Sequence, residues 1–107
     1  MENQLYVVYD SVAQRYMQVY AFASEAQANR SLPLALVDKF HSLSDYELCH
    51  IGSIDVETGV VKTSAPKRLA WKSDALSLSD QIVNDIQRRE DARVFLSQQA
   101  QLNDNRR

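Results

Sequence analysis

The sequence predicts an α+β fold: a small antiparallel sheet (ββαββ order) with helices on one face and a C-terminal helix. Three observations support this expectation. Runs rich in β-branched and aromatic residues recur in the first two thirds of the chain, and a helix-start signal separates two pairs of these runs. The last third places apolar residues at helical spacing. A single sheet covered by helices accounts for all three.

The composition fits one domain. The 107 residues are 45% hydrophobic, enough for a core that buries about two thirds of the unfolded surface. We assign residues 1–76 to the α+β core and residues 77–107 to the C-terminal helix and a frayed tail of the same domain. The 12 basic and 14 acidic residues give a net charge of −2. Any nucleic-acid site must therefore be local.

The N-terminus and the cysteine content indicate the compartment. Residues 1–4 are acidic and only five hydrophobic or aromatic residues follow, so we expect neither a secretion signal nor a membrane span. The single cysteine, Cys49, cannot form an internal disulfide. These features favour a reducing cytosol.

The first strands are expected at residues 5–9 and 16–22, joined as an antiparallel hairpin by residues 10–15. Alternation leaves both faces of the second strand partly apolar, so a helix should cover at least one of them.

Ser24, followed three residues later by Gln27, predicts a capping box and the start of that helix. Pro33 lacks the backbone donor that a helix interior needs, so we expect a kink or a break near residues 31–32. The apolar positions of the helix are Ala28, Leu32, Ala35, Leu36 and Phe40.

Residues 46–54 predict a third strand with a bulge or bend at Gly52. A turn over residues 55–59, in which Gly59 suits a positive φ, leads to a fourth strand at residues 60–63. Pro66 excludes a regular central strand over residues 65–72, which we interpret as a loop or an edge segment.

Ser77 or Ser79 can cap a last helix that runs to about Gln101. This helix is more apolar than one sheet face requires, which suggests a homo-oligomer or a protein partner; folding wholly onto its own sheet is the alternative. Its main stripe is Leu78, Ile82, Ile86, Ala92, Phe95, Leu96 and Ala100, and the candidate interaction residues are Val83, Val94, Phe95 and Leu102.

Three segments resemble one known family. They are residues 5–10 with the strand that follows, Ala28-Asn29-Arg30 in the first helix, and, most specific, the pattern Asp-aromatic-x-Leu-x-x-Ile-Gly continued to Asp-x-x-Thr-Gly, which here runs from Asp45-Tyr46 to Thr58-Gly59. The chain resembles the small nonstructural protein of gokushovirus-type microviruses, which are single-stranded DNA bacteriophages. The resemblance covers about residues 5–63 and implies a DNA-binding or single-strand-synthesis factor, made in the host cytoplasm and absent from the mature virion.

One basic-aromatic cluster is the best candidate for nucleic-acid binding. No acidic residue occurs between Glu57 and Asp74. Cations that neutralise phosphates and an indole that stacks on bases would suit sequence-tolerant binding to single strands. The alternative is that Trp71 and Leu69 pack on the sheet while the lysines are solvated. The cluster consists of Lys62, Lys67, Arg68, Trp71 and Lys72.

Further basic and aromatic side chains are weaker candidates for nucleic-acid binding. Arginines of the last helix and the tail could extend a phosphate surface, but intrahelical pairing with Asp85, Glu90 and Asp91 is the favoured interpretation. Aromatic residues of the first hairpin could stack on bases, although most should be core or cross-strand pairs. The two sets are Arg88, Arg89, Arg93, Arg106 and Arg107, and Tyr6, Tyr9, Tyr16, Tyr20 and Phe22.

No catalytic, metal or cofactor site is expected. Cys49 and His50 are adjacent in a strand and point to opposite faces, so they cannot readily bind one ion together with His41. No oriented nucleophile-and-base set is apparent.

The favoured hypothesis is therefore a non-enzymatic phage accessory protein that binds single-stranded DNA without sequence preference during genome synthesis or packaging. The alternative is an interaction module that acts on a host replication factor or a viral capsid protein through its last helix.

Overall fold

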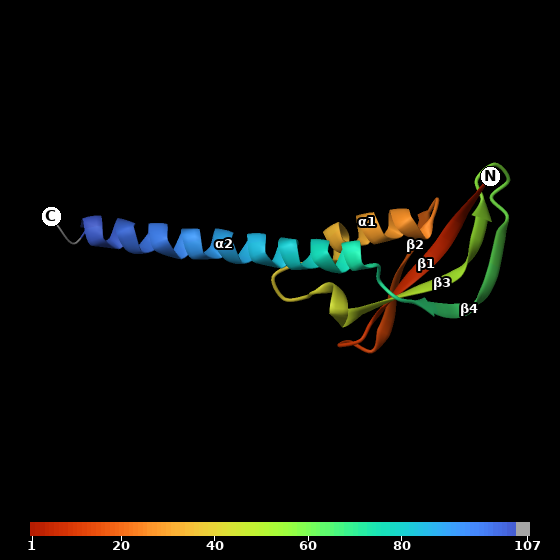
Figure 1. The fold of residues 1–107 in the computed structure, drawn as a ribbon, viewed down its shortest axis with the longest axis horizontal. Helices are drawn as coiled ribbons and strands as arrows, with labels where there is room; N and C mark the ends of the chain where they lie inside the picture. The colour runs from red at the N-terminus through yellow and green to blue at the C-terminus, as the bar shows by residue number, and fades with distance from the viewer. Residues whose placement is uncertain (105–107) are drawn as a thin grey trace.

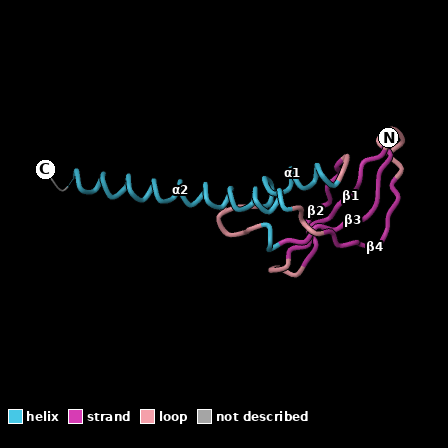
Figure 2. Tube along the Cα trace, in the orientation of Figure 1, coloured by secondary structure: helices cyan, strands magenta, loops and turns pink. Residues whose placement is uncertain are grey.

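The computed structural model describes the backbone of residues 1–104 and the side chains of residues 1–99. A four-stranded antiparallel sheet in the order β2-β1-β3-β4 carries two helices, which confirms the α+β class (Figures 1 and 2). Along the chain, the strands and α-helices follow the order ββαββα. A short 3-10 helix, η1, lies directly before β3. The elements are β1 (Glu2–Asp10), β2 (Arg15–Phe22), α1 (Glu25–Leu36), η1 (Leu43–Asp45), β3 (Tyr46–Asp55), β4 (Val61–Leu69) and α2 (Ser73–Asp104).

The core lies between one face of the sheet and the helices. Tyr6 and Val8 from β1 and Tyr46 and Leu48 from β3 alternate with residues of the other face, so all four side chains point the same way. They pack against apolar residues of α1, η1 and the first turn of α2, namely Ala28, Leu32, Leu36, Leu43 and Ala75. We call this the helix face of the sheet and the opposite side the open face.

The start of α1 follows the sequence signal. The Gln27 amide N–H donates to Ser24 Oγ over 3.2 Å, which confirms Ser24 as the N-cap. The reciprocal half of the expected capping box differs, because Gln27 Oε1 accepts from the Ala23 amide N–H over 2.8 Å rather than from that of Ser24. The expected break near residues 31–32 is wrong, because one helix continues through Pro33 to Leu36. Two of the five expected apolar positions are exposed: Ala35 on the helix, and Phe40 beyond its end.

β2 and β4 are the edge strands, and both differ from expectation. β2 is largely exposed, and only Tyr20 and Phe22 at its end reach the core, so the helix cover expected on one face of this strand is limited to its end. β4 extends to Leu69 rather than ending at residue 63. Pro66 fits there because an edge strand does not need every N–H for pairing.

The bulge expected at Gly52 is confirmed by a register shift between His50 and Gly52. Gly52 has φ +151°, and a Cβ built there would lie 2.0 Å from the backbone oxygen of Lys62. Only glycine allows β3 and β4 to approach this closely. Gly59, in the turn, has the expected positive φ of +76°.

Helix α2 begins at Ser73, four residues before the first serine expected to cap it. Ser79 is buried instead, and its Oγ accepts a hydrogen bond from the Leu43 amide N–H over 3.1 Å. The early turns of α2 lie beside α1, whereas the remainder projects from the molecule, which measures 70 × 29 × 23 Å (Figure 1). Ala92, Phe95 and Leu96 of the expected stripe are exposed. Ala100 and Leu102 lie outside the described side chains.

No helix in the described part of the chain is both long and apolar enough to span a membrane.

Candidate nucleic-acid interface

The basic-aromatic cluster does not form one surface, because β4 divides it between two faces. Lys67 pairs with His50, which contacts the core residue Tyr6 with 5.5 Å between ring centroids. Arg68 pairs with Cys49 on the opposite side. Adjacent strand residues point to opposite faces, so Lys67 lies on the helix face and Arg68 on the open face.

Lys62 and Lys67 offer the freest cations of the cluster. Lys62 pairs with Ser53, and Ser53 in turn pairs with Gln4. Gln4 Oε1 accepts a hydrogen bond from His50 Nε2 on the helix face over 2.8 Å. Both lysines are exposed on the free edge of the sheet, and neither forms an ion pair within the described residues. Their charges are therefore available to an anion.

Trp71 is a packing residue. Its indole Nε1–H donates to the backbone oxygen of Tyr46 over 3.0 Å, and the half-buried ring packs against the core together with Leu69. This geometry agrees with the packing alternative for both residues. It leaves the donor of the indole occupied, and little of the ring is free for a base.

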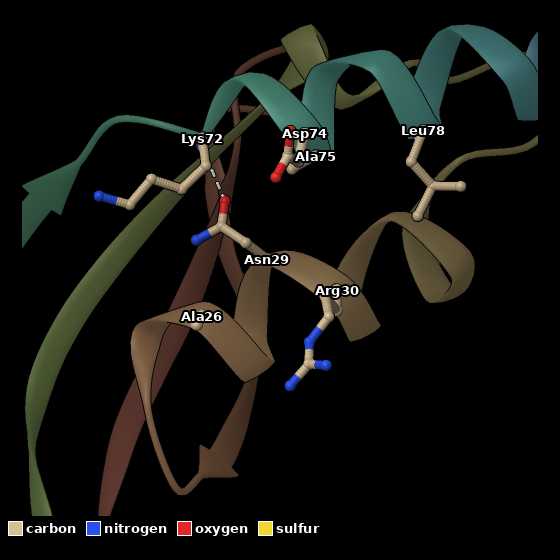
Figure 3. Close-up of a pocket in the computed structure, with 7 residues that line it drawn as sticks. All are labelled: Ala26, Asn29, Arg30, Lys72, Asp74, Ala75 and Leu78. Carbon is tan, nitrogen blue, oxygen red and sulfur yellow. Dashed lines mark hydrogen bonds between the residues drawn. The ribbon is translucent and has the colours of Figure 1, made fainter.

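Lys72 lies at a pocket of about 350 Å³ between α1 and the start of α2 (Figure 3). The buried Asn29 positions this junction, because its Oδ1 accepts from the Lys72 amide N–H over 2.9 Å and its Nδ2 donates to the Glu25 backbone oxygen over 3.0 Å. Lys72 Nζ lies 3.8 Å from Glu25 Oε1, a weak and exposed pair.

Arg30 is a candidate that the cluster omitted. It lines the same pocket as Lys72 and forms no ion pair within the described residues. Asp74 also lines the pocket and offsets part of this positive charge (Figure 3). Arg30 and Lys72 are far apart in the sequence, and only the packing of α1 against α2 brings them together.

The open face holds a different set of side chains. Arg68 forms an ion pair with Glu47, which raises the pKa of the guanidinium through a side-chain hydrogen bond and the charge of Glu47. Tyr9 and Tyr16 pair across β1 and β2 with 5.0 Å between ring centroids. Of the hairpin aromatics, Tyr6, Tyr20 and Phe22 belong to the core, so only the Tyr9–Tyr16 pair remains as a stacking surface.

The residues considered for metal binding are separated. Cys49 is buried on the open face, and burial raises the pKa of its thiol, with a further contribution from Glu47. His50 lies on the helix face, whereas His41 Nδ1 lies 2.9 Å from Asp38 Oδ1 in the loop after α1. No group of three possible metal ligands occurs within the described residues.

The arginines of α2 are not paired as expected. Within the described residues, no ion pair joins Arg88, Arg89 or Arg93 to a neighbouring carboxylate. Glu90 instead pairs with Lys39 from the loop after α1, and Asp91 accepts a hydrogen bond from Gln87 over 3.1 Å. Arg106 and Arg107 lie outside the described residues.

Comparison with known proteins gives one result. A family model described as "Phage ORF5 protein" matches residues 3–78, which include all of the sheet except Glu2, together with α1 and the start of α2. No curated protein and no solved structure matches the chain.

Proposed function

The chain belongs to the Phage ORF5 protein family, since the family model covers well over half of it, and from this premise we propose a single-stranded DNA-binding function. The protein acts as a non-enzymatic accessory factor of a microvirus during genome synthesis or packaging. It works in the host bacterial cytoplasm and is absent from the mature virion. It needs no metal or cofactor.

One observation carries this proposal: Lys62 and Lys67 are exposed on a free sheet edge, in a segment without any carboxylate from residue 58 to residue 73. Lys72 and Arg30 continue the positive charge toward α1. A track of cations without a base-reading pocket suits the sugar-phosphate backbone, which is the same for every sequence.

The proposed contacts differ from the full basic-aromatic cluster. Arg68 faces away and is paired with Glu47, and Trp71 is anchored in the core, so neither contributes a direct contact. Binding without base stacking should be weak and strongly salt-dependent. Each phosphate neutralised adds about 0.7 to the magnitude of the salt slope for single strands.

The test is fluorescence anisotropy of a labelled single-stranded oligonucleotide, measured at several salt concentrations. The double variant Lys62→Ala, Lys67→Ala should lower the slope by about 1.4, twice the contribution of one phosphate. Arg68→Ala is the matched control, because it removes a cation from the same strand but from the open face. An equal decrease of the salt slope in the double variant and in Arg68→Ala would contradict the proposed surface. If the wild type binds no oligonucleotide even at low salt, the proposed function is rejected.

Exposed apolar residues on α2 favour a second candidate function, an interaction module for a host replication factor or a viral capsid protein. Val94 and Phe95 are each 57% exposed. Adjacent exposed apolar side chains are typical of a surface that binds another protein. Protein purified at low salt separates the two functions, since a DNA-binding factor should carry nucleic acid and show a raised ratio of absorbance at 260 to 280 nm. Deleting residues 88–107 should abolish partner capture and leave DNA binding mostly intact.

A further inference from the structure

His50 lies in the sheet next to the lysines of the proposed DNA-binding edge. Lys67 of β4 is its direct partner across the strands, and directly opposite residues have Cβ atoms about 4.5–5.5 Å apart. Lys62 lies on the same face further along β4. Both lysines are exposed and His50 is half-buried. An anion bound by Lys67 would therefore lie within reach of the imidazole.

The hydrogen bond to Gln4 determines which nitrogen of His50 carries the proton of the neutral ring. His50 Nε2 lies 2.8 Å from Gln4 Oε1. An amide oxygen can only accept, so Nε2 is the donor and carries the proton. The other nitrogen, Nδ1, is then an acceptor without a proton. It has no hydrogen-bond partner in the part of the chain that the structure describes.

A phosphate can use Nδ1 of His50 only after this nitrogen gains a proton. Phosphate oxygens are acceptors, and so is the bare Nδ1, so the neutral ring offers them no donor at this position. Protonation of Nδ1 creates both a donor and a positive charge. Charge-assisted hydrogen bonds to phosphate are about twice as strong as neutral ones. Contact between His50 and a DNA phosphate therefore requires the imidazolium form.

The groups around His50 couple this proton to the binding of an anion. Lys67 faces the imidazole from β4, and like charges directly opposite each other on neighbouring strands repel. From β1, Gln4 is uncharged, and the Tyr6 ring lies 5.5 Å from the imidazole between ring centroids. Burial and the charge of Glu25 on α1 raise the pKa of Tyr6, so its phenol stays neutral. A phosphate beside Lys67 offsets the repulsion and favours the proton on His50.

We infer, on the basis of the proposed DNA-binding function, that His50 is a third anion-binding residue of this edge. It contacts a DNA phosphate only in its protonated form, so the protein takes up a proton from solvent when DNA binds. Histidine side chains ordinarily titrate near about pH 6.5. Binding is therefore tightest in mildly acidic solution and weakens as the pH rises.

Fluorescence anisotropy of an oligothymidylate with a pH-insensitive dye tests this inference, at about pH 5.5 and about pH 8 and at several salt concentrations. The oligonucleotide has no terminal phosphate, so it does not itself titrate in this range. At the lower pH the wild type should bind at least about fivefold more tightly, within the limit of about tenfold per pH unit for one proton. Its salt slope should also be larger by about 0.7, the contribution of one further phosphate.

The chain contains 2 histidines, so two variants separate their contributions. His50→Gln should give the same dissociation constant at both pH values, because glutamine can still donate to Gln4 but cannot take up a proton. His41→Gln is the matched control and should keep the wild-type dependence on pH, because His41 is paired with Asp38 in the loop after α1, outside the sheet. If His50→Gln retains the wild-type dependence on pH, the inference is overturned.

Isothermal titration calorimetry of the wild type gives a second measurement that does not depend on a variant. Titrations at about pH 6.5 in two buffers of different ionisation enthalpy report the protons taken up per bound protein, and the number should lie clearly above zero. No proton uptake overturns the inference. If the wild type binds DNA with the same affinity and salt slope at both pH values, the inference fails and the proposed function stands. If it binds DNA at neither pH, both fail.

Discussion

The body of the protein, residues 1–90, and the projecting segment, residues 91–104, are stabilised in different ways. The body buries apolar side chains from the sheet, α1, η1 and the start of α2 in one core. The projecting segment exposes every side chain that the structure describes in it. The same helix, α2, belongs to both. Continuity of secondary structure therefore says little about where stability comes from, since most helical stability comes from packing.

The largest expected difference comes from truncating a leucine in each region. Leu48 is fully buried and Leu96 is 65% exposed. Leu48→Ala should lower the free energy of unfolding by about 2–5 kcal/mol, because it leaves a cavity. Leu96→Ala should change it by less than about 0.5 kcal/mol. Urea denaturation of dilute samples measures both, and a similar loss in the two variants would contradict the division.

A pair of serines on α2 sharpens the comparison. Ser79 Oγ is buried and accepts from the Leu43 amide N–H, so Ser79→Ala should cost about 1–3 kcal/mol by leaving that donor unsatisfied. Ser97 is exposed, and Ser97→Ala should be neutral or slightly stabilising because alanine favours helix. Denaturation curves of the two variants should separate clearly, and coincident curves would argue against the Ser79 contact.

A smaller effect is expected at the turn between β3 and β4. The Asp55 carboxylate accepts from the Glu57 and Thr58 amides, and these hydrogen bonds lower the pKa of Asp55. A lowered folded-state pKa means that the stabilisation is present above the ordinary carboxyl pKa and is lost as pH falls through the lower, folded value.

The melting temperature of the wild type should therefore exceed that of Asp55→Ala at neutral pH, and the gap should close in acid. Asp55→Asn keeps an acceptor without the charge and should show a gap that varies less with pH. A gap for Asp55→Ala that persists unchanged in acid would argue against the charged acceptor.

The smallest effect belongs to the boundary between the two regions. Lys39 and Glu90 form an exposed ion pair, and such pairs contribute about 0.2–1 kcal/mol. A double-mutant cycle with Lys39→Ala and Glu90→Ala isolates this coupling. A value near zero would place the boundary earlier in α2, at the buried Ser79. Hydrogen exchange should show the same transition, with faster exchange beyond the boundary.

Local signals in the sequence were sufficient where neighbours in the chain decide the structure. The N-cap at Ser24, the bulge at Gly52 and the positive φ of Gly59 all depend on residues close in sequence or on the absence of a Cβ. The strand that begins at Tyr46 was predictable because its apolar alternation is local.

The rest depends on contacts between distant segments. The Trp71 indole is held by a hydrogen bond to the backbone oxygen of Tyr46, which is 25 residues away in the sequence. Ser79 was predicted as a possible helix cap, but its hydroxyl instead accepts from the Leu43 amide N–H, 36 residues away. The interpretation of residues 65–72 as a loop or an edge segment placed all the basic residues of the cluster on one surface. In the structure Lys67 and Arg68 are adjacent in β4, so their side chains point to opposite faces of the sheet. Arg30 entered the candidate site only through the packing of α1 on α2.

The free edge of β4 affects how the protein behaves when crowded. Pro66 and the two exposed lysines interrupt an edge that could otherwise accept a strand from a neighbouring molecule. Sheet-to-sheet growth, the usual route to aggregation for small β-containing proteins, is therefore disfavoured at this edge.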